Sequence, residues 1–214
     1  MEGVIYFMDE NDKVIRMEAT YYESEGMLQA LLADHPDLLD GEQVDSTSPR
    51  RWLLVGRELG LASKEEGGDR WSVDHLFLDQ DGIPTIIEVK RSSDTRIRRE
   101  VVGQILEYAE NATKYWPPEK LEAVFEREQV RADRDPEAVI EEFIGSEKDP
   151  DAFWNDVKTN LQAGKVRLVF VADTIPPELR RIANFLNEQM DPAQVLAVEV
   201  RQYLGPDQKA FVPR

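Results

Sequence analysis

The apolar positions along the chain follow two different spacings. Over residues 24–33 they recur every third or fourth residue, which predicts an amphipathic helix that Ser24 can cap and that ends before Pro36. Shorter apolar or alternating runs between turn residues predict strands. The predicted strands cover residues 4–7, 13–17, 52–59, 71–78, 84–90, 166–172, 195–203 and 210–212. Further helices are predicted over residues 96–115, over 117–163 in two or three pieces, and over 176–190.

The order of these elements predicts an α/β fold. A helix is followed by three strands, a helix, a helical insertion, a strand, a helix and a strand. Strands that meander and are then joined by crossover helices build a mixed sheet. We therefore expect an N-terminal β-hairpin over residues 1–20, an α/β core over 21–116 and 164–214, and a helical insertion over 117–163.

The charge of the chain is strongly acidic, with one local reversal. There are 43 acidic and 26 basic side chains, a net charge of −17, and such a surface repels nucleic acid on average. Between Lys90 and Arg99, however, five basic residues accompany a single acid, Asp94. A basic strip of this kind indicates either contact with phosphates or the solvated start of a helix.

Composition narrows the class of protein further. The chain has no cysteine, so it has no disulfide and no thiolate metal site, and a reducing cytoplasm is the expected location. The N-terminus lacks the pattern of a secretory signal, and no apolar run approaches the roughly 20 residues that span a bilayer. We expect no membrane partner. A homodimer, or a further domain beyond the C-terminus, stays open.

The predicted hairpin over residues 71–90 carries the candidate chemistry. If its loop is Gln80-Asp81-Gly82, with Gly82 in the left-handed conformation, Asp74 lies opposite Glu88. Lys90 follows Glu88 by two residues and shares its face of the strand. Two adjacent carboxylates repel each other, and a divalent cation such as Mg²⁺ or Mn²⁺ relieves that repulsion. The backbone carbonyl of Val89 can supply a further ligand.

A surface salt-bridge cluster is the other interpretation of these three residues, and exposed strands often carry one. The apolar run Thr85-Ile86-Ile87 before Glu88 favours an interior strand instead, where solvated charges are unexpected. Both interpretations remain open on spacing alone.

With these residues in place, the chain resembles the PD-(D/E)XK nuclease superfamily. Asp74 followed by Ile87-Glu88-Val89-Lys90 matches its motif, and the element order matches its restriction-endonuclease-like αβββαβ core. Glu25 matches the acidic position of its first helix, and Gln104 with Tyr108 matches the Gln-x-x-x-Tyr signature of its RecB-like members. Residues 27–39 are similar to the opening of NucS-like nuclease domains.

The resemblance implies a metal-dependent endo- or exodeoxyribonuclease acting in DNA repair, processing or defence. Asp74, Glu88 and the Val89 carbonyl would bind Mg²⁺ or Mn²⁺ with help from Glu25, and Lys90 would position the attacking water. DNA is expected over RNA. The remaining candidate residues are Gln104 and Tyr108 as supports for Lys90 or the DNA backbone, and Arg57, Arg91, Arg96 and Arg99 as nucleic-acid contacts.

Each of these assignments has an alternative. Glu25 can be a solvent-facing helix residue, and Tyr108 can belong to an apolar helix stripe with Val101 and Ile105. For the whole chain, the alternative is a non-catalytic nucleic-acid-binding or protein-interaction module on the same fold. The acidic surface favours that alternative, because it suits basic partner proteins, whereas the complete Asp74, Glu88 and Lys90 set favours the enzyme.

Overall fold

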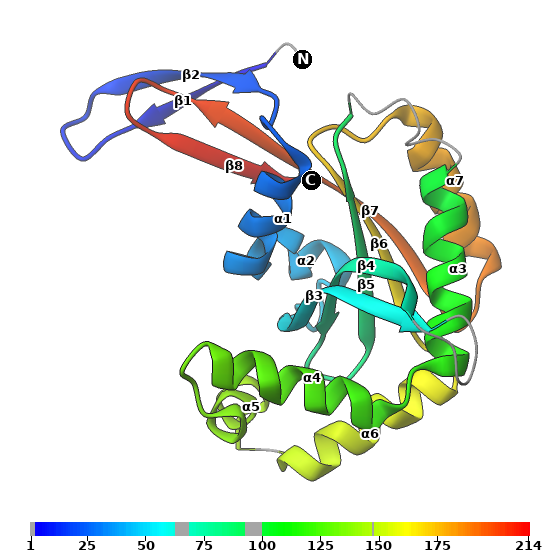
Figure 1. The fold of residues 1–214 in the computed structure, drawn as a ribbon. Helices are drawn as coiled ribbons and strands as arrows, with labels where there is room; N and C mark the ends of the chain where they lie inside the picture. Colours follow the sequence, from blue (N-terminus) through cyan, green and yellow to red (C-terminus); the bar gives the residue numbers. More distant parts are fainter. Residues whose placement is uncertain (1–2, 63–68, 93–99, 147) are drawn as a thin grey trace.

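The computed structural model describes residues 3–62, 69–92, 100–146 and 148–214, and Figure 1 shows their arrangement. The strands are β1 Val4–Met8, β2 Val14–Thr20, β3 Leu53–Ala62, β4 Asp69–Leu78, β5 Pro84–Lys90, β6 Arg167–Ala172, β7 Gln194–Leu204 and β8 Lys209–Pro213. The α-helices are α1 Glu25–Asp34, α2 Gly41–Val44, α3 Glu100–Tyr115, α4 Pro118–Arg131, α5 Pro136–Ile144, α6 Pro150–Gln162 and α7 Pro177–Gln189. A short 3-10 helix covers Pro36–Leu39.

The strands form one mixed sheet, which confirms the predicted α/β class. Their order is β1-β2-β7-β6-β5-β4-β3, and β8 pairs with β7. The β3–β4 and β4–β5 pairs are antiparallel, while the β5–β6 and β6–β7 pairs are parallel. The parallel pairs require crossovers, which α3 to α6 provide between β5 and β6, and α7 provides between β6 and β7.

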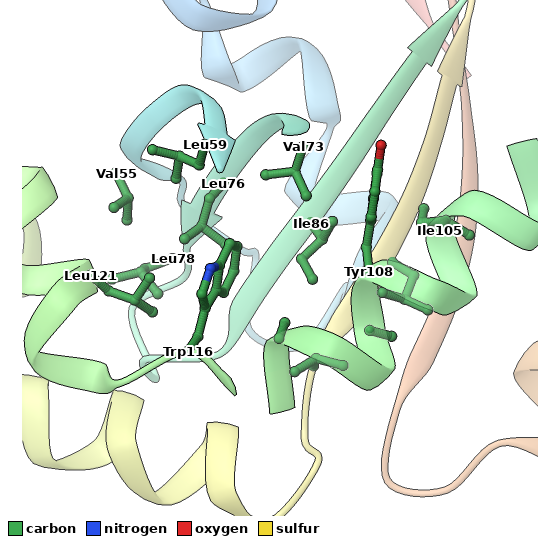
Figure 2. Packing of buried hydrophobic residues seen from close by; sticks show 14 of the residues in the cluster. Val55, Leu59, Val73, Leu76, Leu78, Ile86, Ile105, Tyr108, Trp116 and Leu121 are labelled. Atoms are coloured by element: carbon green, nitrogen blue, oxygen red, sulfur yellow. The ribbon is translucent and has the colours of Figure 1, made fainter. Parts of the chain in front are cut away.

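Both faces of the sheet are covered, and successive residues of the central strands point to opposite sides. On β5, Ile86 belongs to a core with α3, α4, α6 and α7, whereas its neighbours Ile87 and Val89 belong to a second core with α1. Figure 2 shows the first core, where Trp116 and Tyr108 pack among strand and helix side chains. Burial on both faces explains why β5 and β6 are nearly continuous runs of apolar residues.

Three helices, α4, α5 and α6, occupy the predicted insertion. Proline stands in the first turn of each, and Asp135 and Asp149 cap α5 and α6 with their carboxylates. The described residues of this segment contribute no strand to the sheet. The helices lie along the lower side of the sheet in Figure 1, and α6 packs against the loop of the β4–β5 hairpin.

The loop of that hairpin has the predicted geometry. Gly82 is left-handed, with φ of 71°, and its amide donates to the Asp79 carbonyl at 2.9 Å. A Cβ atom at Gly82 would stand 2.9 Å from the Val157 backbone nitrogen of α6. Glycine is therefore required here for both its backbone conformation and the close approach of the helix.

Some elements differ from the sequence-based expectation. The N-terminal hairpin is longer than predicted, because β2 reaches Thr20. It joins the main sheet where Glu18 pairs with Leu204 of β7. Helices over Pro36–Leu39 and Gly41–Val44 were not predicted. Helix α3 begins at Glu100, and the predicted start of this helix lies outside the described residues. In the described part of the chain, no helix is long and apolar enough to cross a membrane.

Candidate metal and active site at the open end of the hairpin

Asp74 lies one residue beyond the pairing of β4 with β5. That pairing runs from Leu78↔Pro84 to His75↔Ile87, the register predicted from the turn. Past its last pair, the Val89 amide donates to Oδ2 of Asp74 at 2.7 Å. The carboxylate of Asp74 thus bridges the two strands where their backbone pairing ends, and the same register brings it alongside Glu88.

Glu88 is the most unusual charged residue of the site. Its side chain is fully buried, because β5 runs between β4 and β6 in the interior of the sheet. Its Oε1 forms an ion pair with Lys90, whereas its Oε2 has no hydrogen-bond partner among the described residues. Burial, together with the charge of Asp74, raises the pKa of Glu88 to about 7. A buried carboxylate with an unpartnered oxygen is costly, so Glu88 is a good candidate for a metal ligand.

Lys90 places its ammonium group among three oxygen atoms. Nζ lies 2.8 Å from Oε1 of Glu88 and 3.2 Å from Oε1 of Glu25. It also donates to the Val89 carbonyl at 3.0 Å. Burial lowers the pKa of Lys90, but the carboxylates of Glu88, Asp74 and Glu25 outweigh that effect and raise it above its ordinary value. Lys90 is therefore a cation at neutral pH and partly neutralises three acids.

Helix α1 brings Glu25 to this group. Ser24 caps the helix by accepting from the Met27 amide, so Glu25 occupies the first turn and faces the end of β5. Gln29 follows one turn later. Its side chain hydrogen-bonds to Asp74, and its backbone carbonyl lies 2.8 Å from Nε2 of the buried His75. Burial lowers the pKa of His75 to about 4, so this histidine is neutral and anchors α1 to β4.

Gln29 was not among the residues predicted from the sequence, although a signal for it exists. It lies four residues after Glu25 and therefore on the same helix face. Together with Asp74, Gln29 lines the α1 side of the candidate site with polar groups. Burial raises the pKa of Asp74, whereas the hydrogen bonds from Val89 and Gln29 and the charge of Lys90 oppose that rise.

Gln104 and Tyr108 of α3 contact each other rather than Lys90 in the described structure. Nε2 of Gln104 donates to the Tyr108 hydroxyl, which donates in turn to the Ser72 carbonyl of β4 at 2.9 Å. Figure 2 shows the ring of Tyr108 in the core, with the hydroxyl pointing away from it. Burial raises the pKa of Tyr108 to about 12, so the hydroxyl stays protonated. The pair anchors α3 to β4 two residues before Asp74.

The candidate nucleic-acid contacts have different surroundings. Nη1 of Arg91 donates to the carbonyls of Tyr22 and Glu23, and so holds the segment before α1. Arg57 is exposed on β3, where it pairs in register with His75. Arg96 and Arg99 lie outside the described residues. Only Arg57 and Arg91 can therefore be placed, and Arg91 has a structural role.

Asp173 is a second buried carboxylate at this end of the sheet and was not predicted from the sequence. It follows β6 directly, and its Oδ1 accepts from the amides of Ser92 and Thr174 at 2.7 and 3.0 Å. These bonds hold the chain after β5 against the end of β6. Asp173 therefore fixes the position of Lys90 indirectly, through the segment that follows it.

The donor set fits a divalent cation that is held only in part by the protein. Within the described residues, no group of three or more His, Asp or Glu side chains is placed to enclose a metal ion. Mg²⁺ does not need such a cage, because one or two carboxylates, water and substrate phosphates usually hold it. Asp74, Glu88 with its unpartnered Oε2, and the Val89 carbonyl supply a partial set of this kind.

Comparison with family models, with curated proteins and with solved structures found no match for this chain. The geometry of the site is therefore the basis for assigning a function.

Proposed function

We propose that this protein is a Mg²⁺- or Mn²⁺-dependent nuclease that hydrolyses phosphodiester bonds in DNA. The observation that carries the proposal is Glu88, a fully buried carboxylate that lies next to a second carboxylate, Asp74, and whose Oε2 has no hydrogen-bond partner among the described residues. A fold that only needed stability would not retain this pair, because each charge disfavours the other. A cation bound between substrate and protein would relieve the repulsion between the two carboxylates.

Each residue of the site has a role in this proposal. Asp74 and Glu88 bind the metal, and the Val89 carbonyl and Glu25 assist. When bound, the metal would lower the pKa of a water molecule and stabilise negative charge on the phosphate. Lys90 orients the attacking water and offsets phosphate charge, which its raised pKa allows at neutral pH. Gln104 and Tyr108 support the site by fixing α3 against β4.

The order of elements supports the same proposal. Helix α1, the β3-β4-β5 meander, α3 and β6 follow one another as in the αβββαβ core of the PD-(D/E)XK superfamily, which the motif residues also resemble. Asp74 and Glu88 come from the second and third strands of the meander, and Glu25 from the first helix. Fold-level analogy alone does not define chemistry, so the site residues carry the argument.

A non-catalytic binding module is the second candidate, and one observation favours it. The ammonium of Lys90 already lies between Glu88 and Glu25 at ion-pair distance, so part of the acidic charge is neutralised without a metal. Lys90 does not relieve the repulsion between the carboxylates fully, because Oε2 of Glu88 keeps no hydrogen-bond partner among the described residues.

A cleavage panel tests the proposal. Labelled single-stranded, duplex and branched DNA, and matching RNA, are incubated with the protein in Mg²⁺, Mn²⁺ or EDTA. We expect metal-dependent cutting of DNA by the wild type and none by Glu88→Gln, which keeps the size of the side chain. Binding without cutting in every metal would favour the second candidate, and cutting by Glu88→Gln at the wild-type rate would contradict the assigned site.

A further inference from the structure

A cleft of about 710 Å³ lies beside the candidate site, along the outer strand of the sheet. One wall is β3, the last strand in the sheet order, and the other is α4 with the turn that follows it. The end of α1 closes the cleft at Ala33 and Asp34. Clefts of this size bury most of a small ligand, so the space suits one or two nucleotides rather than a duplex.

The cleft is connected to the candidate site through two elements. On β3, Arg57 pairs with His75 and Leu59 pairs with Val73, and these two partners are the neighbours of Asp74 on β4. On α1, Glu25 faces the site and Asp34 faces the cleft. Nine helical steps separate these two residues, a rise of about 13 Å. A strand bound at the candidate metal could thus continue into the cleft within a few nucleotides.

The charge of the cleft is opposite to that of the protein. Its walls carry three acidic residues, Asp34, Glu58 and Glu128, against a larger basic set in a chain whose net charge is −17. The basic residues are Arg57, Lys120, Arg127, Arg131 and Arg134. A basic surface preserved within an acidic protein attracts polyanions locally, since the rest of the molecule repels them.

The arginines of α4 are held in place for such contacts. Arg127 and Arg131 both form ion pairs with Glu128, at 3.1 and 2.9 Å, and both remain exposed. Arg134 lies in the turn after α4, where the left-handed Asp133 redirects the chain. The aromatic residue of the cleft, Trp116, is buried, with 5% exposed, so it offers no face for a base to stack on. The cleft therefore suits phosphates better than bases.

We infer that this cleft binds the phosphate backbone of a single-stranded part of the substrate and guides it to the candidate site. The inference rests on the proposed nuclease function and assigns its substrate a single-stranded segment. The insertion helix α4 supplies most of the contacts, which gives the insertion a function. Recognition is by charge, so it does not depend on base sequence.

Salt-dependent binding tests the inference without cleavage. Binding of a short fluorescent oligothymidylate to the full chain is measured by anisotropy across a NaCl series in EDTA. Three proteins are compared: the wild type, Arg131→Gln with Arg134→Gln, and a matched control, Arg180→Gln with Arg181→Gln. The control removes the same charge from exposed positions on α7, which packs against β7 rather than β3.

We expect the cleft variant to bind more weakly and the slope of log K against log salt to fall by about 1.4, since each phosphate contact on a single strand contributes about 0.7. The control should keep the wild-type slope. Equal slopes in wild type and cleft variant, or an equal loss in the control, would overturn the inference. If the wild type still cuts DNA in that case, the nuclease proposal survives alone. A wild type that neither binds nor cuts would contradict both.

Discussion

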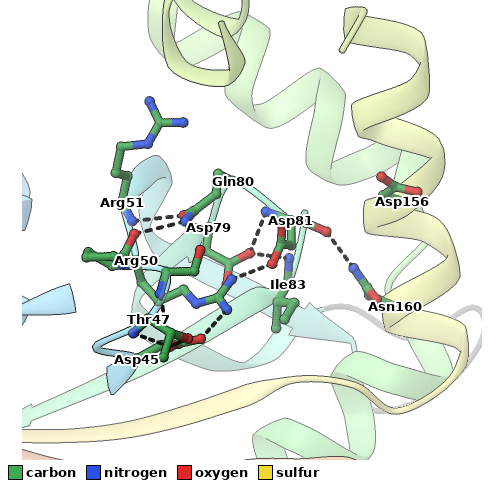
Figure 3. A network of polar contacts seen from close by, with 12 residues as sticks. Asp45, Thr47, Arg50, Arg51, Asp79, Gln80, Asp81, Ile83, Asp156 and Asn160 are labelled. Atoms are coloured by element: carbon green, nitrogen blue, oxygen red, sulfur yellow. Dashed lines mark hydrogen bonds and ion pairs between the residues drawn. The ribbon is translucent and has the colours of Figure 1, made fainter. Parts of the chain in front are cut away.

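The buried carboxylates at the two ends of the β4–β5 hairpin have different surroundings. At the turn end, the fully buried Asp79 is satisfied on both oxygens. Oδ1 accepts from the amides of Asp81 and Ile83, and Oδ2 accepts from Nη1 of Arg167 at 3.1 Å. Figure 3 shows Asp79 with Asp81 and Ile83 and the second cation of this end, Arg50. Arg50 forms an ion pair with Asp81 and lies 3.7 Å from Asp79.

At the open end, acids outnumber bases. Glu25, Asp74 and Glu88 lie around one ammonium, that of Lys90, and Oε2 of Glu88 has no hydrogen-bond partner among the described residues. Arg91 is adjacent in sequence, but its Nη1 is committed to backbone carbonyls before α1. The excess of acidic over basic side chains is confined to the open end, although both ends belong to the same hairpin.

The contrast separates stability from function. Burial of a charge is costly in both places, and the turn end offsets that cost with partners on both oxygens of Asp79. The open end offsets it only in part, as expected of a site that binds a cation. Changes at the turn end should therefore alter folding, and changes at the open end should alter chemistry and metal response.

Removal of Lys90 should have the largest effect of all. In Lys90→Ala we expect the rate of DNA cleavage to fall by about 10²–10⁴-fold, the usual contribution of a group that handles a proton. Metal binding should be nearly unchanged, because the carboxylates remain. Single-turnover cleavage and calorimetric metal titration measure the two quantities. Cutting at the wild-type rate would show that Lys90 does not serve the attacking water.

Removal of Arg167 tests the other end of the hairpin. In Arg167→Leu, Asp79 keeps its charge in a buried position without its closest cation, which typically costs about 3–5 kcal/mol of unfolding free energy. Urea unfolding of the two proteins measures the loss. Arg16→Leu is the control, because its ion pair with Glu18 is exposed and should matter little. A similar result for both arginines would mean that the turn-end network is not stabilising as described.

Local chemistry explains what could be predicted of this hairpin. Its register follows from a short loop with a left-handed Gly82, and its buried strands follow from continuous apolar runs. The helical insertion was equally predictable, since Asp135 and Asp149 cap helices that begin with proline. These features depend on residues that are close in sequence.

Other features depend on contacts between distant segments and could not be predicted. Arg167 and Asp79 are 88 residues apart, and nothing local indicates that their charges meet in the interior. The cleft combines β3 with α4, whose relative positions follow only from the fold. The two short helices between Pro36 and Val44 have four residues each, too few for a periodic pattern.

The pH dependence of stability should separate Glu88 from the other titrating groups. Its pKa is raised from 4.5 to about 7 in the folded protein, so between these values the folded state holds more protons than the unfolded state. Without metal, its contribution to stability is therefore lost as pH rises through this window, by at most about 3 kcal/mol at roughly 1.4 per unit.

The contribution of His75 to stability changes with pH in the opposite direction. Burial lowers its pKa to about 4, so the folded form, in which it is neutral, is favoured at higher pH. Glu88→Gln keeps the histidine effect and removes the glutamate effect. Urea unfolding of both proteins in EDTA across this pH range should show the variant gaining on the wild type as pH rises. Parallel profiles would mean that Glu88 is not buried as a costly charge.

Thermal melting in a metal titration tests the central claim, that the open end of the hairpin is a cation site. Wild type and Glu88→Gln are melted in EDTA and across increasing Mg²⁺ or Mn²⁺. In EDTA the variant should be at least as stable as the wild type, because one of two repelling carboxylates is gone. With metal, the wild type should gain about 2.7 kcal/mol at a hundredfold excess over Kd, and the variant should lose most of that gain. An equal metal response in both proteins would contradict the metal site, and with it the proposed nuclease.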